Sequence, residues 1–394
     1  MKKLSLVSLA LMAAFPALGA DTLTDALTGG TAKLDMRLRY ENVSQDNALK
    51  DADALTLRTR LTYATADYHG LSALVEFEDS RVVAGIDDYN NGLNSKPEYS
   101  TIADPETTEL DQFLLQYQRG GFTGKLGRQV ITLDNHRFVG HVGWRQDRQT
   151  FDGVTLAYAP LDNLKLFYGY IDQRNRILAE ERDVDSKDHL INARFDTGFG
   201  ALSGYGYLLE VDNNIDNGLD TYGLRFAGST ELDAIKLLYA AEYATQESDT
   251  AGVSFDADYY LVEGGVGVSG FTAKLGYEVL GSDDGQYGFS TPLATLHKFN
   301  GWADQFLSTP QEGLVDLYAS IGGGLLGGKW ALVYHDYEAD QASATVDDLG
   351  DEWNLSYTHA FAKHYSAGVK YAAYSAGDIK DDTDKFWVWF SASL

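Results

Sequence analysis

Residues 33–41 of the chain read KLDMRLRYE, with a charged side chain at every odd position and an apolar side chain at every even position. Side chains of a β-strand point alternately to opposite faces of the sheet. This stretch therefore predicts a strand with one apolar and one charged face. Residues 55–63 repeat the alternation, and there Arg58 and Arg60 lie opposite the leucines. Roughly eighteen such segments, with almost no helical pattern between them, favour a barrel with lipid outside and water inside.

The connections between these segments alternate between short and long. Outer-membrane barrels have an even number of antiparallel strands, short periplasmic turns and long extracellular loops. We therefore predict an all-β transmembrane antiparallel β-barrel of about eighteen strands, in which the final segment 386–394 closes the ring by pairing with the first strand. The short joins are expected near 67–70, 119–121, 160–163, 197–200, 228–230, 269–270, 324–328 and 362–363. The long connections are expected near 43–53, 83–107, 132–148, 173–187, 212–219, 247–256, 283–312, 338–350 and 376–384.

The first twenty residues have the pattern of a secretory signal peptide. Two lysines precede an apolar run that ends in small residues, which predicts export and cleavage after Gly19 or Ala20. We expect residues 1–20 to be the signal peptide and residues 21–394 to be a single barrel domain, because no linker-like tract divides the chain. The expected location is the outer membrane of a Gram-negative bacterium.

Composition excludes several classes of function. The formal net charge of −27 argues against nucleic acid as a partner, because phosphate binding needs basic patches. The absence of cysteine excludes disulfides and thiolate metal sites. Residues 212–223 resemble a calcium loop, but the glycine falls one place late and Gly223 replaces the final glutamate. No catalytic motif is found, so we expect no enzymatic activity, no metal site and no cofactor.

The polar faces of several predicted strands carry arginine. Arginine binds carboxylates bidentately and keeps its charge, so a lumenal arginine face is expected to favour anionic solutes. The alternative is that Glu76 and Glu78, which have lumenal parity on the next strand, pair with Arg58 and Arg60 and neutralise the wall. Strand parity assigns six arginines to the lumen, namely Arg37, Arg39, Arg58, Arg60, Arg194 and Arg225.

Two long connections differ from the acidic loops around them. The connection 132–148 is basic and aromatic, and it is expected either to fold into the lumen as a constriction or to hold acidic loops together at the rim. Its candidate residues are Arg137, Trp144, Arg145 and Arg148. The connection 283–312 is too apolar for a flexible tip and is expected to be a packed loop, plug or gate. Its candidate residues are Phe299, Trp302 and Phe306, of which the last two are expected to share one face of a short helix.

Several motifs, taken in order, resemble those of the bacterial alginate-export family of outer-membrane porins. They are YENV at 40–43, DALTLRTRL at 53–61, GRQ at 127–129, GWRQ at 143–146, QTFDGV at 149–154 and FNGWAD at 299–304. The resemblance implies an eighteen-stranded barrel, loops that gate the pore and a basic lumen that passes a polyuronate. It implies a basic path through Arg58, Arg60, Arg128, Arg145 and Arg148. Because arginine is absent beyond Arg225, we expect this lining to cover only part of the wall.

The sequence thus predicts a porin for anionic solutes, with uronate oligosaccharides or polysaccharides as the expected class. A different hypothesis is a plugged surface receptor or structural barrel whose acidic loops bind partners. In either case we expect contact with outer-membrane lipids and lipopolysaccharide, and insertion by the barrel-insertion machinery.

Overall fold

Charged side chains point inward and apolar side chains point outward along the first two strands. In β1 (Thr31–Gln45) the side chain of Arg39 is 0% exposed, whereas the neighbouring Leu38 is 37% exposed. In β2 (Ala52–Ala64) Arg60 is buried and Leu61 is 52% exposed. Soluble proteins show the opposite arrangement. The alternation in the sequence is therefore that of a barrel whose exterior faces lipid.

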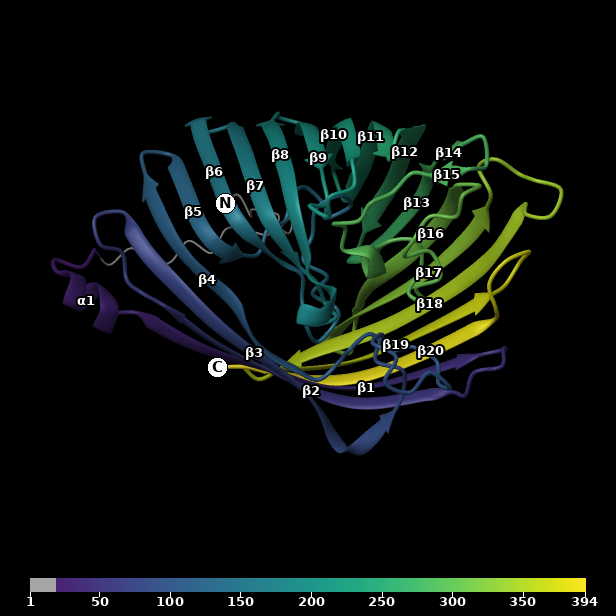
Figure 1. The fold of residues 1–394 in the computed structure, drawn as a ribbon, viewed down its shortest axis with the longest axis horizontal. Helices are drawn as coiled ribbons and strands as arrows, with labels where there is room; N and C mark the ends of the chain where they lie inside the picture. The colour runs from purple at the N-terminus through teal and green to yellow at the C-terminus, as the bar shows by residue number, and fades with distance from the viewer. Residues whose placement is uncertain (1–18) are drawn as a thin grey trace.

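A computed structural model describes residues 19–394 and shows a closed antiparallel barrel of eighteen strands. Consecutive barrel strands are neighbours, and β20 (Thr383–Ser393) closes the ring by pairing with β1, as predicted. Figure 1 shows this closure where the purple and yellow ends of the chain lie side by side. Closure leaves no strand edge unpaired in lipid. The other barrel strands are β3 (Leu71–Asp88), β4 (Thr107–Arg119), β5 (Phe122–Gln129), β6 (Thr150–Leu161), β7 (Leu164–Asn175), β8 (Val184–Asp196), β9 (Gly200–Leu209), β10 (Asn217–Leu232), β11 (Ile235–Thr250), β12 (Val253–Val268), β13 (Phe271–Leu280), β16 (Leu314–Leu325), β17 (Gly328–Glu338), β18 (Asp348–Phe361) and β19 (Tyr365–Ser375).

The remaining elements are short. The helix α1 (Leu23–Thr28) precedes the barrel, and the hydroxyl of Thr22 caps it by accepting a hydrogen bond from an amide in its first turn. The long connections contain two 3₁₀ turns, η1 (Glu180–Arg182) and η2 (Leu296–Lys298), and a small hairpin of β14 (Ser282–Asp283) and β15 (Tyr287–Gly288). No helix within residues 19–394 has the length and apolar composition needed to cross a bilayer. Most of the predicted signal peptide, residues 1–18, lies outside the described residues.

The structure corrects two predicted connections. The short join expected at 228–230 lies at 233–234, because β10 continues to Leu232. The long connection expected at 247–256 is a two-residue turn at Ala251 and Gly252, both with positive φ (52° and 82°), as type I′ hairpin turns require. The last residues of β11 (245–250) are polar on both faces, so their composition resembles a loop although their backbone pairs with β12. The other joins and connections lie where the alternation predicts them.

Candidate pore constriction

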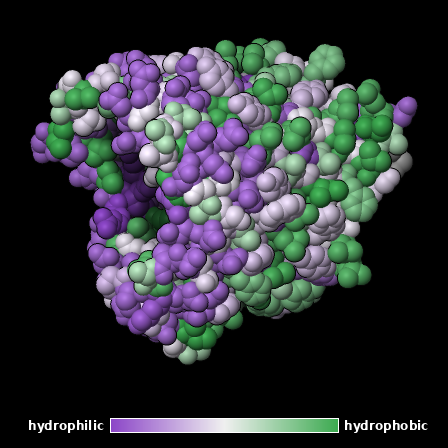
Figure 2. Space-filling view, turned by 90° about the vertical axis from the view of Figure 1, so that its right-hand side faces the viewer, coloured by the Kyte–Doolittle hydropathy of each residue, from purple (hydrophilic) through white to green (hydrophobic). Residues whose placement is uncertain are grey.

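Two long connections fold into the space enclosed by the barrel. We call residues 130–149, between β5 and β6, the first inner loop, and residues 281–313, between β13 and β16, the second inner loop. Phe138 of the first loop packs against Phe289 of the second and against Tyr259 of the wall, with ring centres 6.0 and 5.4 Å apart. In Figure 1 the green segment that carries η2 lies inside the ring of strands. Figure 2 shows a recess in the molecule whose visible walls are mostly hydrophilic.

Arginines of β1 hold the first inner loop against the wall. Arg37 donates hydrogen bonds to the carbonyl oxygens of Gly143 and Trp144 at 3.2 and 2.8 Å and to the side-chain oxygen of Gln146 at 3.0 Å. Arg39 pairs with Asp104, which follows β3, and also donates to the Trp144 carbonyl. Like charges that face each other across a strand pair are unfavourable. The loop therefore supplies acceptors to a crowded group of guanidiniums.

The other wall arginines pair with carboxylates. Arg60 pairs with Glu78, as the neutralised-wall alternative predicted, whereas Arg58 pairs with Asp35 rather than Glu76. Arg128 binds Asp152 bidentately, with distances of 2.7 and 2.9 Å. A role for these residues in guiding a solute stays a prediction, because their nearest partners belong to the protein. The remaining predicted pairs are Arg194 with Asp196 and Arg225 with Glu242.

Arg145 links the two inner loops to each other and to the wall. Its guanidinium lies 3.1 Å from Glu41 of β1 and 2.9 Å from Asp304 of the second inner loop. Burial lowers the pKa of Arg145, but the nearby carboxylates, Glu41 first, raise it more, so the pKa lies above its ordinary value. Asp304 also lies 2.9 Å from Lys385 of β20. These ion pairs link the two inner loops to each other and to β1 and β20.

Two further arginines of the first inner loop bind other parts of the molecule. Arg137 lies 2.9 Å from Glu278 of β13 and donates to Asn300 of the second loop at 3.1 Å. Arg148 pairs with Glu76 and lies 2.7 Å from Asp111 of β4. Arg137, Arg145 and Arg148 therefore hold the first inner loop in place, whereas Trp144, the fourth predicted constriction residue, lines the cavity between the inner loops and β19.

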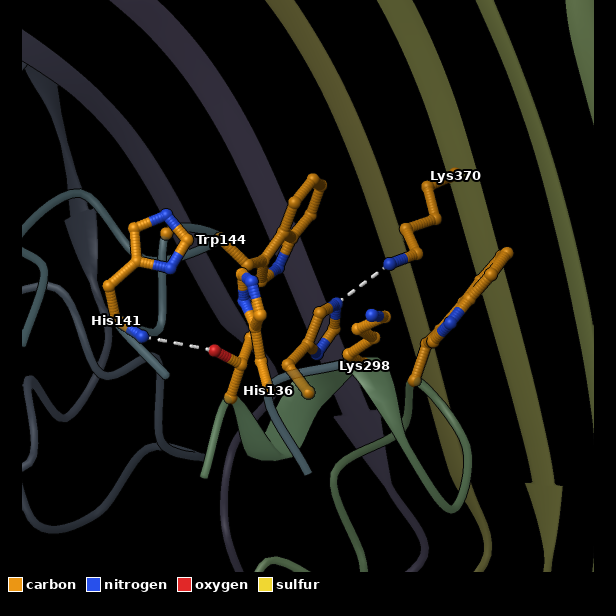
Figure 3. A pocket seen from close by; sticks show the side chains of 9 residues that line it. His136, His141, Trp144, Lys298 and Lys370 are labelled. Carbon is orange, nitrogen blue, oxygen red and sulfur yellow. Dashed lines mark hydrogen bonds between the residues drawn. The ribbon is translucent and has the colours of Figure 1, made fainter. Parts of the chain in front are cut away.

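A cavity of about 500 Å³ lies between the inner loops and β19. It is lined from all three elements, and Figure 3 shows how imidazole, indole and lysine side chains converge on it. None of the described lining residues is acidic, although the chain carries a net charge of −27. The lining residues are His136, His141, Gly143, Trp144, Thr295, His297, Lys298, Trp302 and Lys370.

Lys370 of β19 is stabilised by aromatic rings and an imidazole. Its ammonium nitrogen lies 3.9 Å from the ring centre of Trp302 and 4.3 Å from that of Trp144, both favourable cation–π distances. It also lies 2.7 Å from Nε2 of His297, and Figure 3 marks this contact with a dashed line from Lys370 to an imidazole. Nδ1 of His297 lies 2.6 Å from Asp304. Because Nδ1–H of His297 donates to Asp304, Nε2 is unprotonated and accepts a hydrogen bond from the Lys370 side chain. No carboxylate of residues 19–394 lies within 4.0 Å of the Lys370 nitrogen.

The second lysine of the cavity, Lys298, donates to the carbonyl of Asn135 at 2.7 Å. Three histidines also line the cavity, but burial keeps them neutral at pH 7. Burial and nearby cations lower the pKa of His141 to about 4, and burial lowers that of His297 to about 3. The pKa of His136 is lowered for the same reason. At neutral pH the histidines therefore add little positive charge to the cavity, and the other basic side chains in its lining are Lys298 and Lys370. Burial and nearby cations also lower the pKa of Lys298.

The structure separates the three predicted plug residues. Trp302 lines the cavity, Phe299 lies beneath Arg137 at 4.8 Å, and Phe306 packs against Tyr337 of the wall at 4.7 Å. The prediction of a short helix that places Trp302 and Phe306 on one face is wrong. Gly301 has a φ of +85°, and the amide of Ala303 donates to Glu352 of β18 at 2.8 Å. The backbone bonds of this segment go to the barrel wall, so no helical turn forms.

Sequence reasoning missed Lys370 and the histidines. Lys370 is the one charged residue of β19, and its parity places it on the lumenal face. His136 and His141 lie five residues apart in the first inner loop, His297 lies in the second, and the three share no motif spacing. The sequence signal that could have indicated Lys370 was its inward parity, together with one tryptophan in each inner loop, Trp144 and Trp302.

Comparison with known proteins assigns the chain to a family. The sequence profile of the alginate export family matches residues 31–280. The chain belongs to the alginate export family. Curated protein sequences give no match. Within this family, the closed eighteen-stranded barrel identifies the protein as an outer-membrane channel in a lipid environment.

Solved porin structures share the fold at low sequence identity. Acinetobacter baumannii OccAB1 is 14% identical, with a TM-score of 0.74 over 96% of this chain and 98% of that chain. A. baumannii OccAB4 is 15% identical, with a TM-score of 0.73 over 93% and 98% of the two chains. Pseudomonas aeruginosa OccK9 (OpdG) is 14% identical, with a TM-score of 0.71 over 94% and 100%. The match extends over the whole barrel.

Proposed function

We propose that the barrel is a passive channel for anionic solutes, with uronate oligosaccharides or polysaccharides as the favoured class. The observation that supports this proposal is the lining of the cavity between the inner loops. It contains two lysines and no acidic residue among its described members, in a strongly acidic chain. A positive constriction below an acidic surface selects by charge where the path is narrowest.

The lysines of the cavity have different partners from the wall arginines. Aromatic faces and neutral acceptors surround the nitrogens of Lys370 and Lys298, whereas carboxylates pair with most wall arginines. A charge that no nearby opposite charge cancels acts over a longer distance, more so where the surrounding dielectric constant is low. An anion that enters the constriction therefore meets the lysines rather than the wall arginines.

The aromatic residues suit a saccharide. A uronate presents a carboxylate and a ring with apolar C–H faces, and the constriction offers ammonium groups beside the indoles of Trp144 and Trp302. Contacts of this kind are individually weak, which conduction requires.

The test is electrical. The full mature protein in a planar bilayer, under a KCl gradient, should show a reversal potential of the sign given by chloride preference. Oligouronates should block the current at lower concentration than neutral oligosaccharides of equal length. A cation-selective channel contradicts the anion proposal. A protein that inserts but conducts no current supports the plugged receptor or structural barrel instead.

A further inference from the structure

Three carboxylates converge where the first inner loop meets the barrel wall. Glu78 of β3 and Glu109 of β4 are register partners on adjacent strands, and Asp147 approaches them from the loop. One oxygen of each lies within 4.8 Å of the others. The side chains of Glu78 and Asp147 are each 1% exposed, and Glu109 is half-buried.

Several oxygens of this cluster have no partner. Neither carboxylate oxygen of Asp147 accepts a hydrogen bond from any group in residues 19–394, and the same holds for one oxygen of Glu78. Buried polar atoms in proteins are nearly always satisfied, because leaving them bare costs free energy. Here the bare oxygens lie beside one another, so a single bound group can satisfy all of them.

The local charge is also unbalanced. Arg60 and Arg148 supply two positive charges and pair with Glu78, Glu76 and Asp111. Five carboxylates share this region with those two guanidiniums, namely Glu76, Glu78, Glu109, Asp111 and Asp147. The carboxyl groups therefore outnumber the guanidiniums by three.

We propose that Glu78, Glu109 and Asp147 bind a divalent cation, with Ca²⁺ favoured over Mg²⁺. Carboxylate oxygens are the ligands that Ca²⁺ prefers, and two oxygens each about 2.4 Å from one ion lie at most about 4.8 Å apart. Ca²⁺ tolerates irregular coordination, whereas Mg²⁺ demands near-octahedral geometry and retains its water. A site made from two strands and a loop supplies an irregular set of ligands.

The ion fixes the first inner loop to the wall. Asp147 lies within three residues of Trp144, which borders the cavity. A cation that holds Asp147 against β3 and β4 therefore helps to set the position of Trp144. The site depends on no particular solute and stands whether or not the channel prefers anions.

The test is a Ca²⁺ titration of the full mature protein in detergent micelles after treatment with EGTA. Wild-type protein should bind Ca²⁺ saturably by calorimetry and unfold at a higher temperature when bound, because a ligand that binds only the folded state stabilises it. Mg²⁺ should give a smaller shift at equal concentration. Asp147→Asn should weaken Ca²⁺ binding roughly tenfold or more, since affinity follows the charge count of the ligands.

Two variants complete the test. Glu109→Gln changes the half-exposed ligand and is expected to weaken binding even where Asp147→Asn does not fold. Asp347→Asn removes an exposed carboxylate between β17 and β18 and should leave the Ca²⁺ response unchanged. Absence of saturable binding in the wild type overturns the proposal, and it assigns the cluster to protons shared between carboxyl groups. Equal Ca²⁺ responses in wild type and all variants overturn it too, as adventitious binding to the acidic surface.

Discussion

The Arg145 guanidinium and the Asp304 carboxylate lie 2.9 Å apart, and this buried ion pair joins two inner loops that are separated by more than a hundred residues of sequence. The same guanidinium also reaches Glu41 on the first strand. Both loops and the seam of the barrel therefore share one charged contact. The positions of both inner loops beside the cavity therefore depend on this contact.

Arg145→Gln should loosen both loops. The substitution leaves Glu41 and Asp304 without their shared partner, and loss of one member of a buried ion pair costs roughly 3–5 kcal/mol. We expect a lower thermal unfolding midpoint and noisier single-channel current. The control is Arg81→Gln, which breaks an exposed pair with Asp79 and should cost at most about 1 kcal/mol. Similar effects of both changes would show that the buried contact is not structural.

Lys370→Gln together with Lys298→Gln should move the reversal potential toward cation preference. The two lysines are the basic side chains of the cavity lining apart from the histidines, whose pKa values are lowered. Arg194→Gln is the matched control, because that guanidinium pairs with Asp196 and does not line the cavity. If the control shifts selectivity and the lysine variant does not, the arginine face is the solute path.

Deletion of residues 134–147 should raise single-channel conductance. This segment carries Trp144 and both histidines that the first inner loop contributes to the cavity. The control is deletion of 342–345, an exposed tip between β17 and β18. Equal conductance in the wild type and the 134–147 deletion would place the narrowest point elsewhere.

Gly301→Ala should displace the second inner loop. The φ of Gly301 is +85°, and an added Cβ atom clashes with Glu352 Oε2 and with the Tyr337 hydroxyl. Gly285→Ala is a matched control in the same loop, with a φ of +70° and nothing within 4 Å of the added atom. Both changes carry a backbone cost of about 1–2 kcal/mol, so faster limited proteolysis of Gly301→Ala alone reports the clash. Indistinguishable cleavage rates would rule the clash out.

Anion preference should rise as the pH falls through about 4. Burial, with Arg148, His136, Arg60 and Lys298 nearby, lowers the pKa of His141 to about 4, so its imidazole is neutral at pH 7 and adds positive charge to the cavity only in acid. An unfolded histidine has a pKa of about 6.5, so the unfolded chain takes up this proton first and stability declines between pH 6.5 and 4. Carboxylates titrate in the same range. The measurement is therefore the difference in reversal potential between wild type and His141→Gln, and no difference at pH 4 contradicts the assignment.

The sequence by itself determined the barrel. Alternation with a period of two is a local property of the sequence. Strands with one charged face and one apolar face are stable in a membrane as a closed barrel, with lipid outside and water inside. Arg39 and Leu38 are adjacent in sequence and opposite in exposure for this reason. The alternation of short and long connections located most turns. It failed at 247–256, because the end of β11 has the polar composition of a loop while its backbone pairs with β12.

Only the tertiary structure decided the constriction. The sequence identified the two loops but not their partners, because each loop folds against side chains from strands that are distant along the chain. Arg58 pairs with Asp35 and leaves Glu76 to Arg148. The cavity gathers Lys370 from β19 and Trp302 from a loop whose backbone bonds go to the wall. The partner of each side chain depends on which buried charges and hydrogen-bonding groups can be satisfied together in three dimensions. A local sequence pattern does not contain that information.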